Sequence, residues 1–162
     1  MFHGAIFLSL KAEGIIQERA IKIAKPLGIC SMISAAILIL LSYFQTDLFH
    51  SAIAVVSTIV AFILLALSWY LMSVKKAKIT MLSNGLSIAL SVTALFLGLF
   101  PRVMVSSIKP EYSLTITNAS SSVNTLLLMS KVALIFVPIV LAYQIWSYWI
   151  FRKRVTTKDL KY

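Results

Sequence analysis

Side chains that could carry out acid–base or metal chemistry are few in this chain, and they show no metal-binding spacing. The sequence has two histidines, five acidic residues and one cysteine, Cys30, which lies inside an apolar run and cannot form an internal disulfide. No second ligand is placed to join His3, so we expect that side chain to be packed or hydrogen-bonded. Phosphate-binding, dinucleotide-binding and zinc-protease motifs are absent. We therefore expect no catalytic residue, no metal site and no bound cofactor in this chain.

The densest group of polar side chains lies in the segment 100–122, FPRVMVSSIKPEYSLTITNASSS, between two long apolar runs. Arg102 could pair with a phosphate or a carboxylate, and Tyr112 could dock on an aromatic surface. The hydroxyls and amide before the following run, among them Asn118 and Ser121, suit the capping of a helix. Capping and packing of the segment, or direct contact of these four residues with a partner chain or a lipid, both remain open.

Composition indicates that the elements around this segment lie in a membrane. Sixty per cent of the 162 residues are hydrophobic, and mean hydropathy is +0.95. A soluble domain of this size could not bury so much apolar surface. The formal net charge of +10 falls in short segments between apolar runs, which fits membrane topology and excludes a nucleic-acid-binding face.

Four apolar runs are long enough to span a bilayer, which takes about 20 residues. They are Leu27–Phe44, Ser51–Val74, Ile79–Phe100 and roughly 126–151. Residues 1–10 look like the last turns of a further spanning helix, and 11–25 like a short amphipathic cytoplasmic helix that ends at Pro26. The predicted fold is therefore all-α: an integral membrane four-helix bundle preceded by the truncated end of another helix and the short amphipathic one.

Basic residues predict how the spans are oriented. If all four runs cross the membrane, twelve of the fifteen lysines and arginines fall on one side, and only Arg102, Lys109 and Lys131 on the other. This bias assigns the first side, with the C-terminus, to the cytoplasm. The expected organisation is residues 1–25, a four-helix module over 26–151 with an external loop at about 101–125, and a basic cytoplasmic tail over 152–162.

Small side chains recur along one face of the third span. The stripe consists of Ser83, Ser87, Ser91, Ala94 and Gly98. Such stripes let helices approach closely in lipid, and Asn84 beside it could hydrogen-bond across helices. The stripe predicts a packing interface, but the pattern leaves open whether the partner is internal or another subunit.

The chain resembles subunit II of cytochrome bd-type quinol oxidases over essentially its whole length. The residues that carry the resemblance are His3-Gly4-Ala5, Leu10-Lys11, Glu13-Gly14 and Glu18-Arg19-Ala20; Phe100-Pro101, Val103-Met104, Ser106-Ser107, Tyr112 to Ile116 and Asn118 to Ser122; and Val132 to Gln144, Tyr148-Trp149 and Phe151 to Arg154. The loop and the last helix are the specific parts. The family subunit looks like two four-helix halves, and this chain matches the second half with the end of the helix before it.

The resemblance implies part of a bacterial plasma-membrane complex of the aerobic respiratory chain that oxidises quinol and reduces oxygen. Heme b and heme d would lie in the partner, subunit I, for which this chain would be a scaffold without catalytic residues of its own. Arg102, Tyr112, Asn118 and Ser121 would then contact subunit I, a quinone or lipid. Two alternatives remain: a non-functional gene fragment, and a free-standing small membrane protein with a scaffold or transporter-like role. The sequence does not indicate which quinone would be used.

Overall fold

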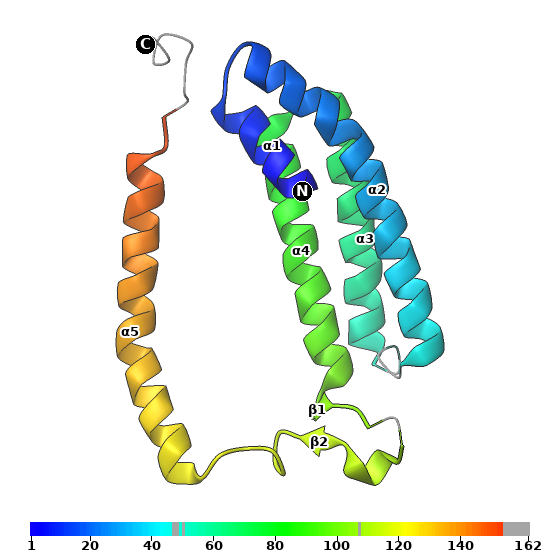
Figure 1. Cartoon of the computed structure of the whole chain (residues 1–162), viewed down its shortest axis with the longest axis vertical. Helices are drawn as coiled ribbons and strands as arrows, with labels where there is room; N and C mark the ends of the chain where they lie inside the picture. Colours follow the sequence, from blue (N-terminus) through cyan, green and yellow to red (C-terminus); the bar gives the residue numbers. More distant parts are fainter. Residues whose placement is uncertain (47–48, 50, 107, 154–162) are drawn as a thin grey trace. The chain divides into compact units, whose positions relative to one another are not determined.

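The structure is a computed structural model, which describes residues 1–46, 49, 51–106 and 108–153. Its elements along the chain are α1 (Phe2–Lys11), α2 (Ile15–Gln45), α3 (Ala52–Ser73), α4 (Ala77–Leu99), β1 (Arg102–Met104), a 3₁₀ helix (Pro110–Tyr112), β2 (Leu114–Thr115) and α5 (Val123–Ile150) (Figure 1). Helices α2 to α5 are each long and apolar enough to cross a membrane. The predicted all-α membrane fold is confirmed.

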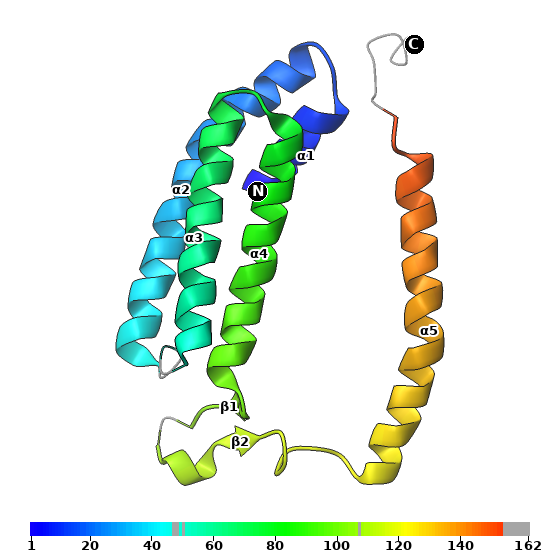
Figure 2. The same ribbon diagram turned by 180° about the vertical axis from the view of Figure 1, so that it is seen from behind.

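Of the described residues, 1–100 form one compact unit and 101–153 another. In the first unit α3 packs along α4, α2 along α3, and α1 between α2 and α4. Figures 1 and 2 show α1 beside the first half of α4, at the end where α3 turns into α4. There the buried core forms, from Phe2, Ala5, Ile6, Ala24 and Met72.

A tight turn connects α1 to α2 and positions this core. Gly14 has φ 69°, in the left-handed region that glycine adopts without strain. The Gln17 side-chain amide donates to the Ser9 carbonyl at 3.0 Å, which fastens the first turn of α2 to the last turns of α1. The short N-terminal helix is therefore held by hydrogen bonds as well as by apolar packing.

The expected helix end at Pro26 is wrong, because α2 continues through Pro26 as one helix of 31 residues. Proline removes one backbone donor and crowds the preceding turn, which usually breaks a soluble helix. Membrane helices tolerate proline when neighbouring groups compensate. The carbonyl that Pro26 leaves without a helical donor is that of Lys22. The Trp69 indole of α3 donates to the nearby Lys25 carbonyl at 3.1 Å and so joins this turn of α2 to α3. The amphipathic segment is thus the first part of a spanning helix.

The second unit begins with a small hairpin that was not predicted from the sequence. Strands β1 and β2 pair antiparallel, with Arg102 opposite Thr115 and Met104 opposite Leu114 and an irregularity between the pairs. Helix α5 follows and starts at Val123, three residues before the expected boundary. Lys131 therefore lies about two turns inside the helix rather than one.

Apolar surface dominates the outside of these helices. Side chains such as Leu82 on α4 and Phe96 one turn before its end are 73% and 74% exposed, which suits contact with lipid. In the predicted basic tail the structure describes Arg152 and Lys153, and the remaining residues, 154–162, lie outside the described part. The cytoplasmic position of that tail remains a prediction from the distribution of charge.

Candidate functional site

The segment between α4 and α5 is an ordered hairpin closed by its own polar groups. Ser113, just before β2, is buried, and its Oγ accepts the backbone N–H of Ser106 at 3.2 Å. The Ile116 N–H donates to the Pro101 carbonyl at 3.0 Å. These two bonds connect the arms of the hairpin around the 3₁₀ helix, so the segment has a defined shape.

Asn118, one of the four candidate contact residues, makes three hydrogen bonds within the hairpin. Its Oδ1 accepts the Thr115 N–H at 2.6 Å, and its Nδ2 donates to the Ser113 carbonyl at 3.2 Å. Its own N–H donates to Thr115 Oγ1 at 3.2 Å. Asn118 therefore closes the turn that leaves β2, an arrangement in which asparagine replaces backbone hydrogen bonds.

The other three candidates lie at different places on the same segment. Arg102 is half-buried in β1. Tyr112 is 62% exposed, with the Lys109 ammonium 6.0 Å from the centre of its ring. Ser121 is exposed just before α5. The structure brings Arg102 into the hairpin with Asn118 through the pairing of β1 and β2, and it places Ser121 beyond them.

Capping of α5 is performed by Ser122, one of the hydroxyls expected for this role. Its Oγ accepts the Thr125 N–H at 3.4 Å and lies 2.9 Å from Thr125 Oγ1. A hydroxyl acceptor at this position satisfies one of the unpaired first-turn amides of a helix. A hydroxyl at the end of the segment therefore caps α5. Of the four candidate contact residues, Tyr112 is the one with a large, exposed aromatic ring.

Serines of the α4 stripe bond directly to the backbone of α3. The Ser83 hydroxyl donates to the Leu64 carbonyl at 2.9 Å, and the Ser87 hydroxyl donates to the Ala61 carbonyl at 2.7 Å. Both serines are buried, as is Gly98. Ser91 is exposed and donates to the Ser87 carbonyl of its own helix at 2.9 Å.

A pair of polar side chains connects α1 to α4 within the first unit. Asn84 Nδ2 lies 2.8 Å from His3 Nδ1, and Asn84 is only 2% exposed. An amide nitrogen is a donor, so His3 Nδ1 is the acceptor in this arrangement. The cross-helix bond expected of Asn84 and the hydrogen-bonded state expected of His3 are both confirmed. In the sequence, the signal for this bond was that His3 and Asn84 are polar residues inside apolar helices, where polar side chains tend to pair with each other.

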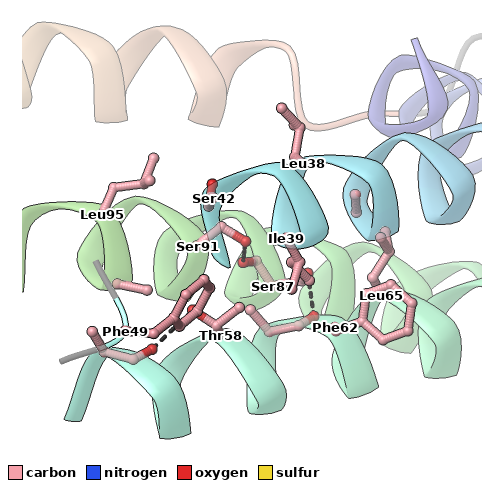
Figure 3. A pocket seen from close by; sticks show the side chains of 14 residues that line it. Leu38, Ile39, Ser42, Phe49, Thr58, Phe62, Leu65, Ser87, Ser91 and Leu95 are labelled. Carbon is pink, nitrogen blue, oxygen red and sulfur yellow. Dashed lines mark hydrogen bonds between the residues drawn. The ribbon is translucent and has the colours of Figure 1, made fainter. Parts of the chain in front are cut away.

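An apolar cavity of about 170 Å³ lies between α2, α3 and α4 (Figure 3). Four hydroxyls line it, from Ser42, Thr58, Ser87 and Ser91. Three of them donate to a backbone carbonyl: Thr58 to Ala54 at 2.8 Å, with Ser87 and Ser91 as described. Leucine, isoleucine, phenylalanine and alanine form most of the remaining wall. Among the described residues that line the cavity, none has an ionisable side chain.

A close approach of three helices lies at the other end of the same unit. A Cβ built on Gly28 of α2 would lie 2.5 Å from Trp69 Cδ1 and 3.1 Å from Phe2 Cε2. The Trp69 indole reaches the Lys25 carbonyl across this gap. Only glycine leaves room for that contact, and apart from the glycine itself no pattern in the sequence indicates it.

These groups hold helices together. Among the described residues no three histidine, cysteine, aspartate or glutamate side chains lie close enough to hold a metal ion. The four long apolar helices define a multi-pass helical membrane protein. The polar groups described above join its helices or close the hairpin between α4 and α5.

Comparison with known proteins identifies the family. Residues 1–151 match the family described as cytochrome bd terminal oxidase subunit II. The chain therefore belongs to the cytochrome bd oxidase subunit II family, as the resemblance in the sequence implied.

Individual relatives agree with the family match. The chain is 38% identical over 159 residues to cytochrome bd ubiquinol oxidase subunit 2 of Bacillus subtilis (strain 168), covering 97% of this chain and 47% of the relative. It is 37% identical over 86 residues to cytochrome bd-I ubiquinol oxidase subunit 2 of Escherichia coli (strain K12), covering 53% of this chain and 23% of the relative. The chain thus spans about half the length of the Bacillus relative and less of the Escherichia one.

Proposed function

We propose that this chain acts as part of subunit II in a cytochrome bd-type quinol oxidase of a bacterial plasma membrane, as a scaffold for the heme-bearing subunit I. In this role hemes b and d and the oxidation of quinol belong to subunit I. The match of residues 1–151 to the subunit II family is the observation that carries the proposal. We further propose that the chain works together with a preceding half of the subunit and that its C-terminus is cytoplasmic.

The ordered hairpin supports a contact with subunit I. Its backbone is fixed by Asn118 and Ser113, while the Tyr112 ring remains 62% exposed. A large aromatic ring on a rigid support is the kind of side chain that anchors protein interfaces. We propose Tyr112 as the main contact of this segment, with Arg102 beside it and with Asn118 holding its position; Ser121 would lie at the edge of the contact.

A free-standing membrane scaffold or transporter-like protein is the second candidate. This candidate is supported by the first unit, in which α1 to α4 share a core and hydrogen bonds join α4 to α3 and to α1. Transporter sites use broken helices and polar groups near the middle of the membrane. In the described residues the cavity between α2 and α4 is apolar instead, which favours the oxidase subunit over a transporter.

The test is co-purification with a heme-bearing subunit I. The tagged chain is co-expressed with subunit I and with the remainder of subunit II, and the reduced-minus-oxidised visible spectrum of the eluate is recorded. We expect heme bands in the eluate and a reduced heme yield for Tyr112→Ala. Tyr70→Ala is the matched control, because Tyr70 is 61% exposed but lies on α3 near the basic turn. A heme-free eluate from the complete set of subunits would refute the scaffold role, whereas equal yields for both tyrosine variants would refute only the Tyr112 contact.

A further inference from the structure

Six basic side chains gather at the end of the first unit where α3 turns into α4. This cationic collar consists of Arg19, Lys22 and Lys25 on α2 and Lys75, Lys76 and Lys78 at the α3–α4 connection. All six are exposed, and within the described part of the chain none of these side chains forms a hydrogen bond or an ion pair. The acidic residues of α2 and the turn before it, Glu18 and Glu13, leave a net positive charge.

Figures 1 and 2 show the start of α2 next to the α3–α4 connection, at the same end of the first unit. The Trp69 indole reinforces this arrangement by donating to the Lys25 carbonyl at 3.1 Å. Lys75 follows Trp69 by fewer than two turns of helix. The packing of α2 on α3 therefore brings two separate basic segments to one surface.

The backbone at Lys75 shows that a lysine stands where glycine would be easier to accommodate. Lys75 has φ 61°, and its N–H and that of Lys76 donate to the Met72 and Leu71 carbonyls, both at 3.1 Å. This is the helix ending in which glycine is usual, because other residues are strained in the left-handed region. Strained residues are found preferentially at functional positions, and here the strained residue is one of the collar cations.

Apolar side chains lie beside the collar on α2. Ile16 and Ile23 are 47% and 56% exposed, two helical turns apart on one stripe, with Arg19 next to them; Ala20 and Ala24 face the core. The 31 residues of α2 rise about 46 Å, whereas the hydrocarbon layer is about 30 Å thick. The first part of α2 therefore reaches headgroup depth, where isoleucine can contact acyl chains and lysine or arginine can contact phosphate.

We propose that the cationic collar binds the headgroups of anionic phospholipids, with Ile16 and Ile23 against their acyl chains. Charge complementarity selects an anionic partner, and the adjoining exposed isoleucines select a lipid over an acidic protein surface. The site is independent of the hairpin and of the assembly proposed above.

Trp69 provides the probe, because its indole bonds to Lys25 within the collar. The full chain carries three tryptophans, so Trp146→Phe and Trp149→Phe leave Trp69 as the only emitter. This variant is reconstituted in phosphatidylcholine containing phosphatidylglycerol with brominated acyl chains, and separately with brominated phosphatidylcholine. The ratio of the two quenching curves gives the preference of the Trp69 neighbourhood for the anionic lipid.

We expect a several-fold preference for phosphatidylglycerol that weakens at high salt. Lys22→Gln and Lys75→Gly should each lower this preference measurably, by at most about fivefold, which is the value of one basic residue close to an anionic surface. Lys75→Gly also relieves the backbone strain, so its unfolding midpoint should rise while the lipid preference falls, which separates lipid binding from folding. Lys109→Gln, in the hairpin, is the control and should change nothing.

Equal quenching by the two brominated lipids would overturn the proposal. An unchanged preference in both Lys22→Gln and Lys75→Gly would overturn it as well. If collar variants instead lost a co-purifying protein chain while the lipid preference was absent, the collar would be a protein contact and the lipid proposal would be refuted.

Discussion

Replacing Gly28 by alanine tests whether the meeting of α1, α2 and α3 is as tight as the structure shows. The added Cβ would lie 2.5 Å from Trp69 Cδ1. Carbon atoms that are not bonded to each other do not approach so closely, so the indole must move. Its movement would break or lengthen the 3.1 Å bond to the Lys25 carbonyl. The opposing effect is helix propensity, because alanine in a helix interior is favoured over glycine by about 1 kcal/mol.

These effects can be compared in size. Overpacking of a well-packed site destabilises by about 1–3 kcal/mol, and loss of one hydrogen bond adds about 1 kcal/mol. Subtracting the propensity gain leaves Gly28→Ala destabilising by about 1–3 kcal/mol in the free energy of unfolding. Gly85→Ala on α4 is the matched control, since nothing lies within 4 Å of a Cβ built there. That control should be stabilised by up to about 1 kcal/mol.

The assay is reversible unfolding of the purified full chain in mixed micelles, followed by the fluorescence of Trp69 in the variant with the other two tryptophans replaced. Gly28→Ala should also shift the Trp69 emission in the folded state, since the ring leaves its partner. If Gly28→Ala and Gly85→Ala were equally stable, and the emission unchanged, the close approach at Gly28 would be wrong.

Three further predictions follow from hydrogen bonds in the two units. A double-mutant cycle of His3→Leu and Asn84→Leu should give a coupling free energy of about 0.6–1.7 kcal/mol, the range for such bonds in membranes; additive effects would exclude the bond. Asn118→Ala should speed proteolysis of the hairpin by at least tenfold, whereas Ser121→Ala should leave it unchanged, because only Asn118 closes the turn; equal cleavage rates would contradict this. Ser87→Ala should lower the free energy of unfolding by about 1 kcal/mol, measured as for the glycine variants, and no change would argue against its bond to α3.

The spanning helices were predictable because the length and apolarity of a run are enough to identify a membrane segment. Expected and observed boundaries for α3 differ by a single residue at each end, Ser51–Val74 against Ala52–Ser73. Pro26 misled the prediction, because a proline acts locally as a breaker, whereas the helix continues where this turn of α2 is joined to α3. The Trp69 indole that donates to the Lys25 carbonyl there lies 43 residues from Pro26 in the sequence. A long-range partner of this kind leaves no pattern near the proline.

The hairpin could not be predicted for a different reason. Its strands have only three and two residues, too short for an alternating pattern to be recognised. Capping chemistry before α5 was visible in the sequence, and Ser122 fulfils it. The bonds that fix Asn118 depend on where β1 meets β2, which composition alone does not determine.

The two serine bonds between α4 and α3 have a consequence for how this protein can change over evolutionary time. Both acceptors, at Leu64 and Ala61, are main-chain carbonyls, which every amino acid possesses. The hydroxyl bonds therefore fix the axial register of α3 without depending on the identity of the side chains at the acceptor positions. A sequence can drift at lipid-facing positions of α3, to suit another lipid composition or growth temperature, while α4 keeps the pair in the same alignment.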